Sequence, residues 1–151
     1  MGSKSNAFET SLLTLLFNNT DIANIGDAAG ILGSTADGSL YVRLYTSAVA
    51  VDESTIGTEC AYTGYVAKGV AVARTAGGWT ISGNNASNAA AVTFGPCTAG
   101  SETIRYFAIW VDNVNTTDAY RLFWGQLTAD LAVSAGITPE FAIGDIDVNE
   151  D

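Results

Sequence analysis

The strongest local pattern in the sequence lies at residues 61–82, which read AYTGYVAKGVAVARTAGGWTIS. Larger apolar side chains alternate with small or hydroxyl-bearing ones at 70–73 and again at 79–82, the period of two that is typical of strands. Between these segments lies Gly77-Gly78, and glycine readily takes the positive φ angles of a tight turn. The stretch is therefore predicted to form a β-hairpin.

The rest of the chain is expected to complete one small domain. With 151 residues it is long enough to bury roughly two-thirds of its unfolded surface, so residues 1–151 are predicted to form a single domain. Hydrophobic residues make up 48% of the chain and charged residues only 15%. Soluble domains usually carry about 25% charged residues, so we expect that another chain covers part of this surface.

The net charge of −10 argues against direct nucleic-acid binding, because such binding relies on basic side chains that neutralise phosphates. The longest apolar runs, such as residues 12–17, are much shorter than the roughly 20 residues that span a bilayer. The first five residues lead into no secretory signal. We therefore expect a protein that is made in the cytoplasm and has neither nucleic acid nor a membrane as a direct partner.

The sequence contains no histidine, which removes the commonest general base and the commonest metal ligand. Its two cysteines, Cys60 and Cys97, lack a metal-ligand spacing and are expected to be free thiols in a reducing compartment. Asp52 and Glu53 are interpreted as part of a solvated loop rather than as a glycosidase pair, and residues 112–118 as a hairpin tip rather than a calcium loop. No catalytic residue, metal or cofactor is predicted.

An N-terminal helix is predicted over about residues 6–18. Asn6 suits the N-cap, and Glu9 three residues later can bond back to it. Leu13 and Phe17 widen an apolar face whose members recur at helical spacing, namely Phe8, Leu12, Leu15 and Leu16. Such a helix either packs on its own sheet or docks on a neighbouring subunit, and the sequence leaves both alternatives open.

Two further segments have strong strand patterns. At residues 39–46, Tyr41, Arg43 and Tyr45 alternate with leucine and valine, and residues 102–111 are apolar on both faces, as expected of a central strand. Shorter candidate strands cover 86–94, 119–128, 131–133, 137–143 and 146–148. This series of short strands behind one helix predicts a mainly β fold, an antiparallel β-sandwich of jelly-roll type over about residues 39–148.

Short motifs that are spread in order over nearly the full length carry a resemblance to a known family. They are Lys4-Ser5-Asn6-Ala7-Phe8-Glu9 with Leu12–Phe17, Gly38–Val42, Ala61–Tyr65, Val72-Ala73-Arg74 with Gly78-Trp79, Asn88–Phe94, and Gly136–Phe141 with Gly144. With these motifs the chain resembles small tailed-bacteriophage virion proteins, which are usually labelled tail fibre or head decoration proteins. It departs from the family pattern at 47–60 and 110–120, where we expect partner specificity to differ.

The resemblance implies a non-enzymatic structural protein of the virion, made in the host cytoplasm. Its size and lack of repeats favour a capsid decoration (cement) protein, bound as a homotrimer to the outside of the head, over an elongated fibre. The alternatives are a tail fibre or a host-receptor or glycan-binding module of the virion, and a glycan-active enzyme. The expected partners are other copies of the chain and the major capsid protein or other virion proteins.

The candidate interface residues are apolar side chains that a neighbouring chain would cover. Strands with two apolar faces and a helix with a wide apolar face present more apolar surface than one small domain can bury by itself. The candidates are Phe8, Leu12 and Leu16 in the helix, and Tyr41, Tyr45, Tyr106 and Trp110 in the strands. We expect residues 3–17 to lie on the side that attaches to the capsid.

Overall fold

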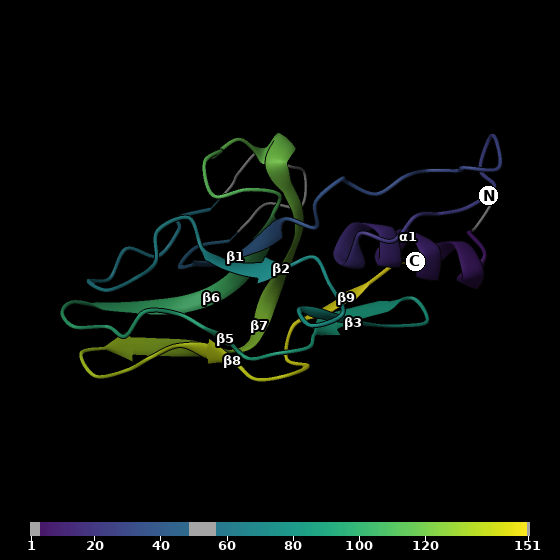
Figure 1. The fold of residues 1–151 in the computed structure, drawn as a ribbon. Coiled ribbons are helices and arrows are strands. Elements are labelled where there is room, and N and C mark those ends of the chain that lie inside the picture. The colour runs from purple at the N-terminus through teal and green to yellow at the C-terminus, as the bar shows by residue number, and fades with distance from the viewer. Residues whose placement is uncertain (1–3, 49–56, 151) are drawn as a thin grey trace. The chain divides into compact units, whose positions relative to one another are not determined.

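The structure is a computed structural model that describes residues 4–48 and 57–150. Within these residues the chain begins with one α-helix and continues as strands joined by loops and one 3-10 helix (Figure 1). No helix among them is long and apolar enough to cross a membrane. The elements are α1 Asn6–Asn18, β1 Ser39–Tyr45, β2 Val70–Ala73, β3 Trp79–Ser82, β4 Asn85–Asn88, β5 Val92–Thr93, β6 Ser101–Trp110, the 3-10 helix η1 Asp118–Tyr120, β7 Arg121–Ser134, β8 Glu140–Phe141 and β9 Asp147–Asn149.

The strands of the described chain form a four-stranded sheet in the order β2-β1-β6-β7, a three-stranded sheet in the order β3-β4-β9, and the pair β5-β8. The neighbours β1 and β6, β6 and β7, β3 and β4, and β4 and β9 are antiparallel. The predicted fold class, mainly β with antiparallel sheets and an N-terminal helix, is confirmed. These sheets are compatible with a sandwich-like arrangement, and the jelly-roll topology stays a prediction.

The chain divides into two compact units, each assembled from segments that are far apart in the sequence. The first unit comprises residues 1–39, 72–91 and 141–151, and the second comprises residues 40–71 and 92–140. Each unit has buried residues of its own, such as Phe17 and Trp79 in the first and Ile104 and Trp110 in the second. The organisation of residues 1–151 as a single domain stays a prediction.

In the first unit, α1 buries a face that differs from the predicted one. Glu9, Leu13 and Phe17 are buried, and the Phe17 ring lies 4.7 Å from the ring of Trp79 in β3. The predicted face is only partly covered, because Phe8 is exposed and Leu12, Leu15 and Leu16 are half-buried. Apolar residues surround so much of this helix that periodicity alone does not select the face, and contact with Trp79 decides it.

Ser5 and Arg74, which the sequence analysis does not single out, bind backbone groups at the two ends of α1. The N-cap is Ser5 rather than Asn6, and its hydroxyl accepts a hydrogen bond from the Phe8 N–H at 3.3 Å. The last turn contains no basic residue, yet Arg74, just after β2, donates to the carbonyls of Leu15 at 2.8 Å and Leu16 at 2.7 Å. Arg74 thereby satisfies helix-end carbonyls and places a positive charge at the negative end of the helix dipole.

The predicted hairpin at residues 61–82 is wrong, because β2 and β3 belong to different sheets. Neither Gly77 nor Gly78 takes a positive φ. Residues 75–79 instead form a helical turn in which the Trp79 N–H donates to the Thr75 carbonyl at 2.9 Å. The hairpin of this region pairs β3 with β4 through the turn Gly83-Asn84, where Gly83 has a φ of 62°.

In the second unit, β6 lies between β1 and β7, as predicted for a central strand. The strands predicted at 119–128 and 131–133 are one continuous strand, β7, whereas residues 86–94 divide between β4 and β5 in different sheets. Cys60 and Cys97 are both buried and free, as expected.

The motif at residues 61–65 crosses a second loop at very close range. The Tyr62 hydroxyl donates to the Gly95 carbonyl at 2.9 Å, and the Thr98 N–H donates to the Thr63 carbonyl at 2.8 Å. Gly64 has a φ of 105°, and a Cβ placed on it would lie 2.0 Å from the Pro96 carbonyl oxygen. Glycine is therefore required at this crossing both for its conformation and for its lack of a side chain.

Candidate functional site

Antiparallel pairing of β1 with β6 brings the predicted aromatic residues together on one face of the four-stranded sheet. Tyr41 lies opposite Trp110, and Tyr45 lies opposite Tyr106. Because strand residues point alternately to the two faces, these four side chains share a face with Arg43. Trp124 of β7 joins them, since its ring centre lies 6.5 Å from that of Tyr106.

The aromatic residues of this face differ in burial. Tyr45 and Trp110 are buried, whereas Tyr41 and Tyr106 are half-buried. The three helix candidates, Phe8, Leu12 and Leu16, belong to the first unit. The assignment of all seven residues to a partner interface stays a prediction, with Tyr45 and Trp110 already covered by the chain itself.

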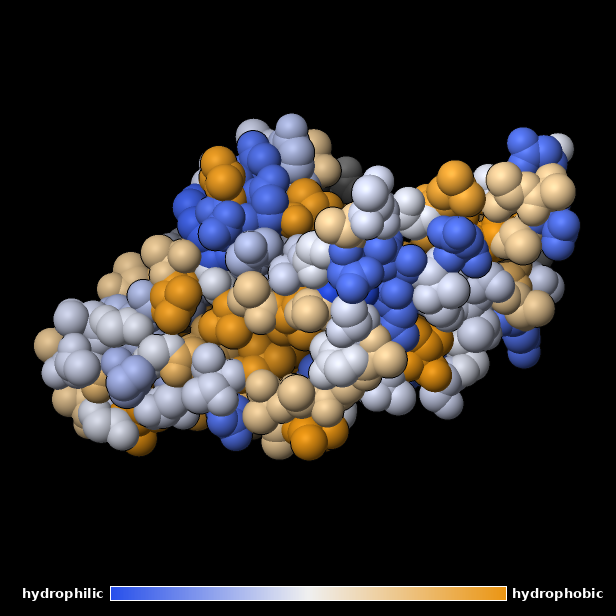
Figure 2. Space-filling model, viewed as in Figure 1, coloured by the Kyte–Doolittle hydropathy of each residue, from blue (hydrophilic) through white to orange (hydrophobic). Residues whose placement is uncertain are grey.

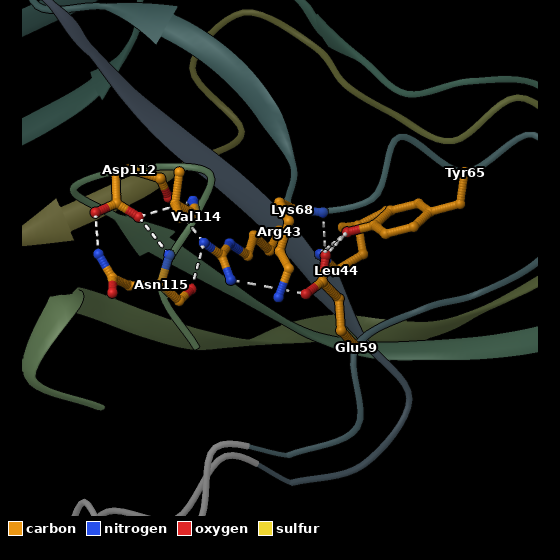
Figure 3. A network of polar contacts seen from close by, with 8 residues as sticks. All are labelled: Arg43, Leu44, Glu59, Tyr65, Lys68, Asp112, Val114 and Asn115. Carbon is orange, nitrogen blue, oxygen red and sulfur yellow. Dashed lines mark hydrogen bonds and ion pairs between the residues drawn. The ribbon is translucent and has the colours of Figure 1, made fainter. Parts of the chain in front are cut away.

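Arg43 is the charged residue at the centre of this face, and its exposed fraction is only 1%. Its Nη2 donates to the carbonyls of Asp112 at 2.7 Å and Asn115 at 3.0 Å, and its Nη1 lies 3.7 Å from the Glu59 carboxylate (Figure 3). The guanidinium carbon also lies 4.0 Å from the centre of the Trp110 ring. Arg43 therefore joins β1 to the β6–β7 connection through charge-assisted hydrogen bonds.

The β6–β7 connection is organised by Asp112. Its carboxylate accepts hydrogen bonds from the backbone N–H groups of Val114 at 2.9 Å and Asn115 at 2.8 Å, and from the Asn115 amide at 2.6 Å. These bonds, chiefly those from Asn115, hold the pKa of the Asp112 carboxyl below its usual value. The turn thus points the carbonyls of Asp112 and Asn115 at Arg43, and the hairpin-tip interpretation of residues 112–118 is confirmed by the β6–β7 pairing.

Glu59 links Arg43 to the loop at residues 65–69. One carboxylate oxygen, Oε1, accepts from the Tyr65 hydroxyl at 3.1 Å and from the Lys68 backbone N–H at 2.8 Å (Figure 3). The Tyr65 hydroxyl in turn accepts from the Leu44 N–H at 3.0 Å. Burial, followed by the Glu59 charge, raises the pKa of the Tyr65 hydroxyl, so Tyr65 is protonated and can donate to Glu59.

Lys68 has an unusual backbone conformation beside this network. Its φ is 68°, a left-handed value that non-glycine residues rarely adopt, and Gly69 follows with a φ of 89°. A Cβ on Gly69 would lie 2.4 Å from the Val42 carbonyl oxygen, so the chain passes directly against β1 there. Lys68 also lines the edge of a cavity.

The cavity has a volume of about 270 Å³. It lies in the second unit, over the Arg43 side of the aromatic face, and is lined by Arg43, Tyr45, Gly57, Glu59, Lys68, Trp110 and Thr116. Three buried polar atoms among these residues have no hydrogen-bond partner in the described protein: Arg43 Nε, Tyr45 Oη and Trp110 Nε1. Such orphan groups are rare in protein interiors and call for an explanation.

The tyrosine of the cavity is held in its protonated form. Burial, followed by the Glu59 charge, raises the pKa of the Tyr45 hydroxyl to about 12. Trp110 lies close enough to lower that pKa slightly, although its indole N–H and the phenol oxygen do not reach hydrogen-bond geometry. At neutral pH the Tyr45 hydroxyl is therefore protonated.

The described residues contain no group of three or more His, Cys, Asp or Glu side chains that could hold a metal ion. Asp52 and Glu53 lie outside the described residues. The sequence analysis names Tyr45 and Trp110 as candidates for a partner interface, which stays a prediction, and it does not single out Arg43, Glu59 or Lys68. One usable signal is Arg43 itself, a lone charge between two tyrosines on a strand face.

A family model described as Podophage GP4 fiber I protein gp80 matches residues 3–149, nearly the whole chain. A comparison with curated proteins found no match. The predicted kinship with tailed-phage virion proteins is thereby confirmed, and with it the location in the virion. The chain belongs to the family of podophage GP4 fiber I protein gp80 and is a structural protein of a phage virion.

Proposed function

We infer that this chain is a building block of a virion fibre, where it assembles with copies of itself and attaches to other virion proteins without catalysing a reaction. The observation that carries this proposal is the family match over residues 3–149, whose description names a fibre protein. The proposed assembly is a homotrimer. Its role is mechanical and adhesive, so it needs folded surfaces rather than a reactive centre.

The long outer strand β7 supports assembly between copies. β7 spans 14 residues at one edge of its sheet, and no described strand pairs with its outer side. Most of its residues are half-buried or exposed, including Trp124, Leu127 and Leu131. An unpaired edge of this length is a ready template for another chain, and folded proteins usually protect such edges.

The surface has further apolar residues that a neighbouring protein would cover. Hydrophobic residues reach the face shown in Figure 2 at several separate places. The large exposed apolar side chains of the second unit include Val66, Val111, Val114, Leu131 and Ile137. The net charge of −10 keeps unassembled copies apart, which favours their addition to an existing particle over aggregation.

Capsid decoration is the second candidate, and the major capsid protein is then the partner. It is favoured by the absence of sequence repeats, because a fibre shaft is commonly repetitive. Both candidates predict an oligomeric virion protein, and they differ in where it sits on the particle. A location experiment therefore separates them more directly than any binding assay.

The test is to image particles after labelling with gold-conjugated antibodies raised against the purified chain. We expect label at the tail or its fibres. Label distributed over the head would replace the fibre proposal with decoration, and label on neither would overturn both. Light scattering on the purified chain is expected to give three times its mass of 15.6 kDa.

A further inference from the structure

The loop that follows α1 presents large aliphatic side chains to solvent. Ile25, Ile31 and Leu32 have exposed fractions of 40%, 43% and 62%. All three lie within residues 25–32 of the first unit. An exposed apolar side chain that occurs singly needs no explanation, but a group of them on one loop is typical of a surface that another protein covers.

Hydrogen bonds across this loop hold its backbone in one conformation. Ile22, which is buried, and Ile31 exchange two backbone hydrogen bonds of 2.9 Å. At the base of the loop, the Asn19 side-chain amide donates to the Ser34 carbonyl at 2.9 Å, and the Asn19 side-chain oxygen accepts from the Ser34 N–H at 2.6 Å. The exposed side chains are therefore carried on a preorganised backbone, which lowers the entropic cost of binding.

The two carboxylates of the loop also hold its shape. Asp21 accepts a hydrogen bond from the Gly33 N–H at 2.7 Å. Asp27 accepts from the N–H groups of Ala29 at 2.9 Å and Gly30 at 3.0 Å. The loop thus combines an apolar exposed surface with negative charge and has no basic residue of its own.

The first unit as a whole is acidic. Its two basic side chains are already bound, because Lys4 forms an ion pair with Glu150 at 2.8 Å and Arg74 donates to carbonyls at the end of α1. A second copy, with its net charge of −10, is repelled by this surface, as are the phosphates of nucleic acids and phospholipids. The unit has a formal net charge of −6, from those two basic residues and eight acidic ones, namely Glu9, Asp21, Asp27, Asp37, Asp145, Asp147, Glu150 and Asp151.

We propose that residues 22–32 attach this chain to a different virion protein, one that has an apolar pocket for Ile31 and Leu32 and basic residues around that pocket. This inference rests on the proposed function, in which the chain attaches to other virion proteins. Burial of each aliphatic side chain in the pocket strengthens binding by about tenfold or more. The basic residues attract the acidic unit and make this partner preferred over a second copy.

The test uses virions from a phage whose copy of this gene carries a stop codon, so that the partner is present and the chain is absent. The purified full-length chain is titrated against these particles, and cosedimentation measures its affinity. The test variants are the double substitution Ile31→Ser with Leu32→Ser and the single substitution Leu32→Ser, because both side chains are exposed. Ile143→Ser is the matched control, since Ile143 is 70% exposed in the same unit but lies outside the loop.

We expect Leu32→Ser to bind the particles about tenfold more weakly than the wild type, and the double variant about 100-fold more weakly. Ile143→Ser should bind as the wild type does. Raising the NaCl concentration from about 50 mM to about 500 mM should weaken wild-type binding, because salt screens the attraction between the acidic unit and a basic partner. Circular dichroism and light scattering are expected to show the same fold and the same oligomer in all variants.

The outcomes separate this inference from the proposed function. Weaker binding of both loop variants, with their oligomeric state unchanged, supports the inference. If the loop variants bind as the wild type does, or if Ile143→Ser loses as much affinity as they do, the inference is overturned and the proposed function stands. Dissociation of the oligomer by Leu32→Ser overturns it by placing a second copy at the loop, and binding that ignores salt overturns the basic partner. A wild-type chain that does not bind the particles contradicts the proposed function itself, and this inference with it.

Discussion

The guanidinium carbon of Arg43 lies 4.0 Å from the centre of the Trp110 indole ring. The two residues come from neighbouring strands, and the β1–β6 register, in which Arg43 faces Ala108 and Trp110 faces Tyr41, places them diagonally on one face. A cation held over an indole ring away from water is stabilised by about 2 kcal/mol. The contact therefore helps to offset the desolvation of a buried charge.

Arg43→Leu is expected to lower the free energy of unfolding by about 3 kcal/mol, because it removes two charge-assisted hydrogen bonds and the ring contact and leaves Glu59 without its cation. Urea denaturation followed by tryptophan fluorescence measures the change. Arg105→Leu is the matched control, since the Arg105 side chain is 45% exposed and pairs with an exposed Asp130. Its expected effect is below about 1 kcal/mol, and similar losses in the two variants would contradict the central role of Arg43.

Gly64→Ala tests the crossing of residues 61–65 with the loop that contains Pro96. The added Cβ would lie 2.0 Å from the Pro96 carbonyl oxygen, so we expect destabilisation of about 3 kcal/mol or more. Gly136→Ala is the control, because Gly136 has a similar φ of 92° but open space around its Cβ position. Conformational strain alone should lower its stability by about 1–2 kcal/mol. Equal melting temperatures of the two variants would show that the contact between the added Cβ and the Pro96 carbonyl does not lower stability.

Stability is expected to fall at alkaline pH, beginning with Cys60. Burial, followed by the Glu102 charge, raises the pKa of the Cys60 thiol from 9.0 to about 12. Above pH 9 the unfolded chain releases this proton while the folded chain retains it, so the stabilisation that is complete below pH 9 is lost between pH 9 and 12. The loss should not exceed about 1.4 kcal/mol per pH unit, and solvent screening reduces it.

Urea denaturation at several pH values from about 7 to 11 measures this dependence. Cys60→Ala should be less stable than the wild type at neutral pH. Between pH 9 and 10, before the tyrosines contribute, it should lose less stability than the wild type does. Tyr45 and Tyr62 add to the fall only at higher pH, because burial raises the pKa of each from 10.0 to about 12. Parallel pH profiles for the wild type and Cys60→Ala would rule out the thiol as a source.

The sequence contains enough information for the faces of the strands but not for their partners. Alternation places Tyr41, Arg43 and Tyr45 on one face of β1, and the structure agrees. That Tyr106 and Trp110 meet them depends on the register of two strands about 60 residues apart, which no pattern within one strand specifies. The cavity further depends on Lys68, whose left-handed backbone is fixed by contact of Gly69 with β1.

The failed hairpin shows why a strong local pattern can mislead. Gly77-Gly78 suits a tight turn, but the same residues are accommodated in a helical turn when the flanking segments have other partners. Those partners are distant in sequence: Arg74 binds carbonyls of α1, and Trp79 packs on Phe17. Tertiary contacts thus override the local preference, and sheet pairing follows them.

Phe17→Ala is expected to destabilise the first unit by about 3–5 kcal/mol, since a fully buried ring beside Trp79 is lost. Phe8→Ala lies on the same helix but removes an exposed ring, so its effect on stability should be below about 0.5 kcal/mol. Thermal unfolding of the two variants measures the difference. If Phe8→Ala is stable yet fails to join virions, the exposed side of α1 docks on a partner. If Phe8→Ala and Phe17→Ala are destabilised equally, the assignment of Phe17 to the buried face of α1 and of Phe8 to its exposed face is contradicted.

Leu131→Lys tests whether the outer edge of β7 joins copies of the chain. Leu131 is 37% exposed on this strand, and a lysine there places a charge where a neighbouring chain would lie, the device by which natural edge strands prevent pairing. We expect the variant to remain folded by circular dichroism while light scattering gives the 15.6 kDa monomer in place of the trimer. Val114→Lys is the matched control, because Val114 is 76% exposed but lies in the β6–β7 connection. If Leu131→Lys stays trimeric while Val114→Lys dissociates, the interface lies at that connection and not along β7.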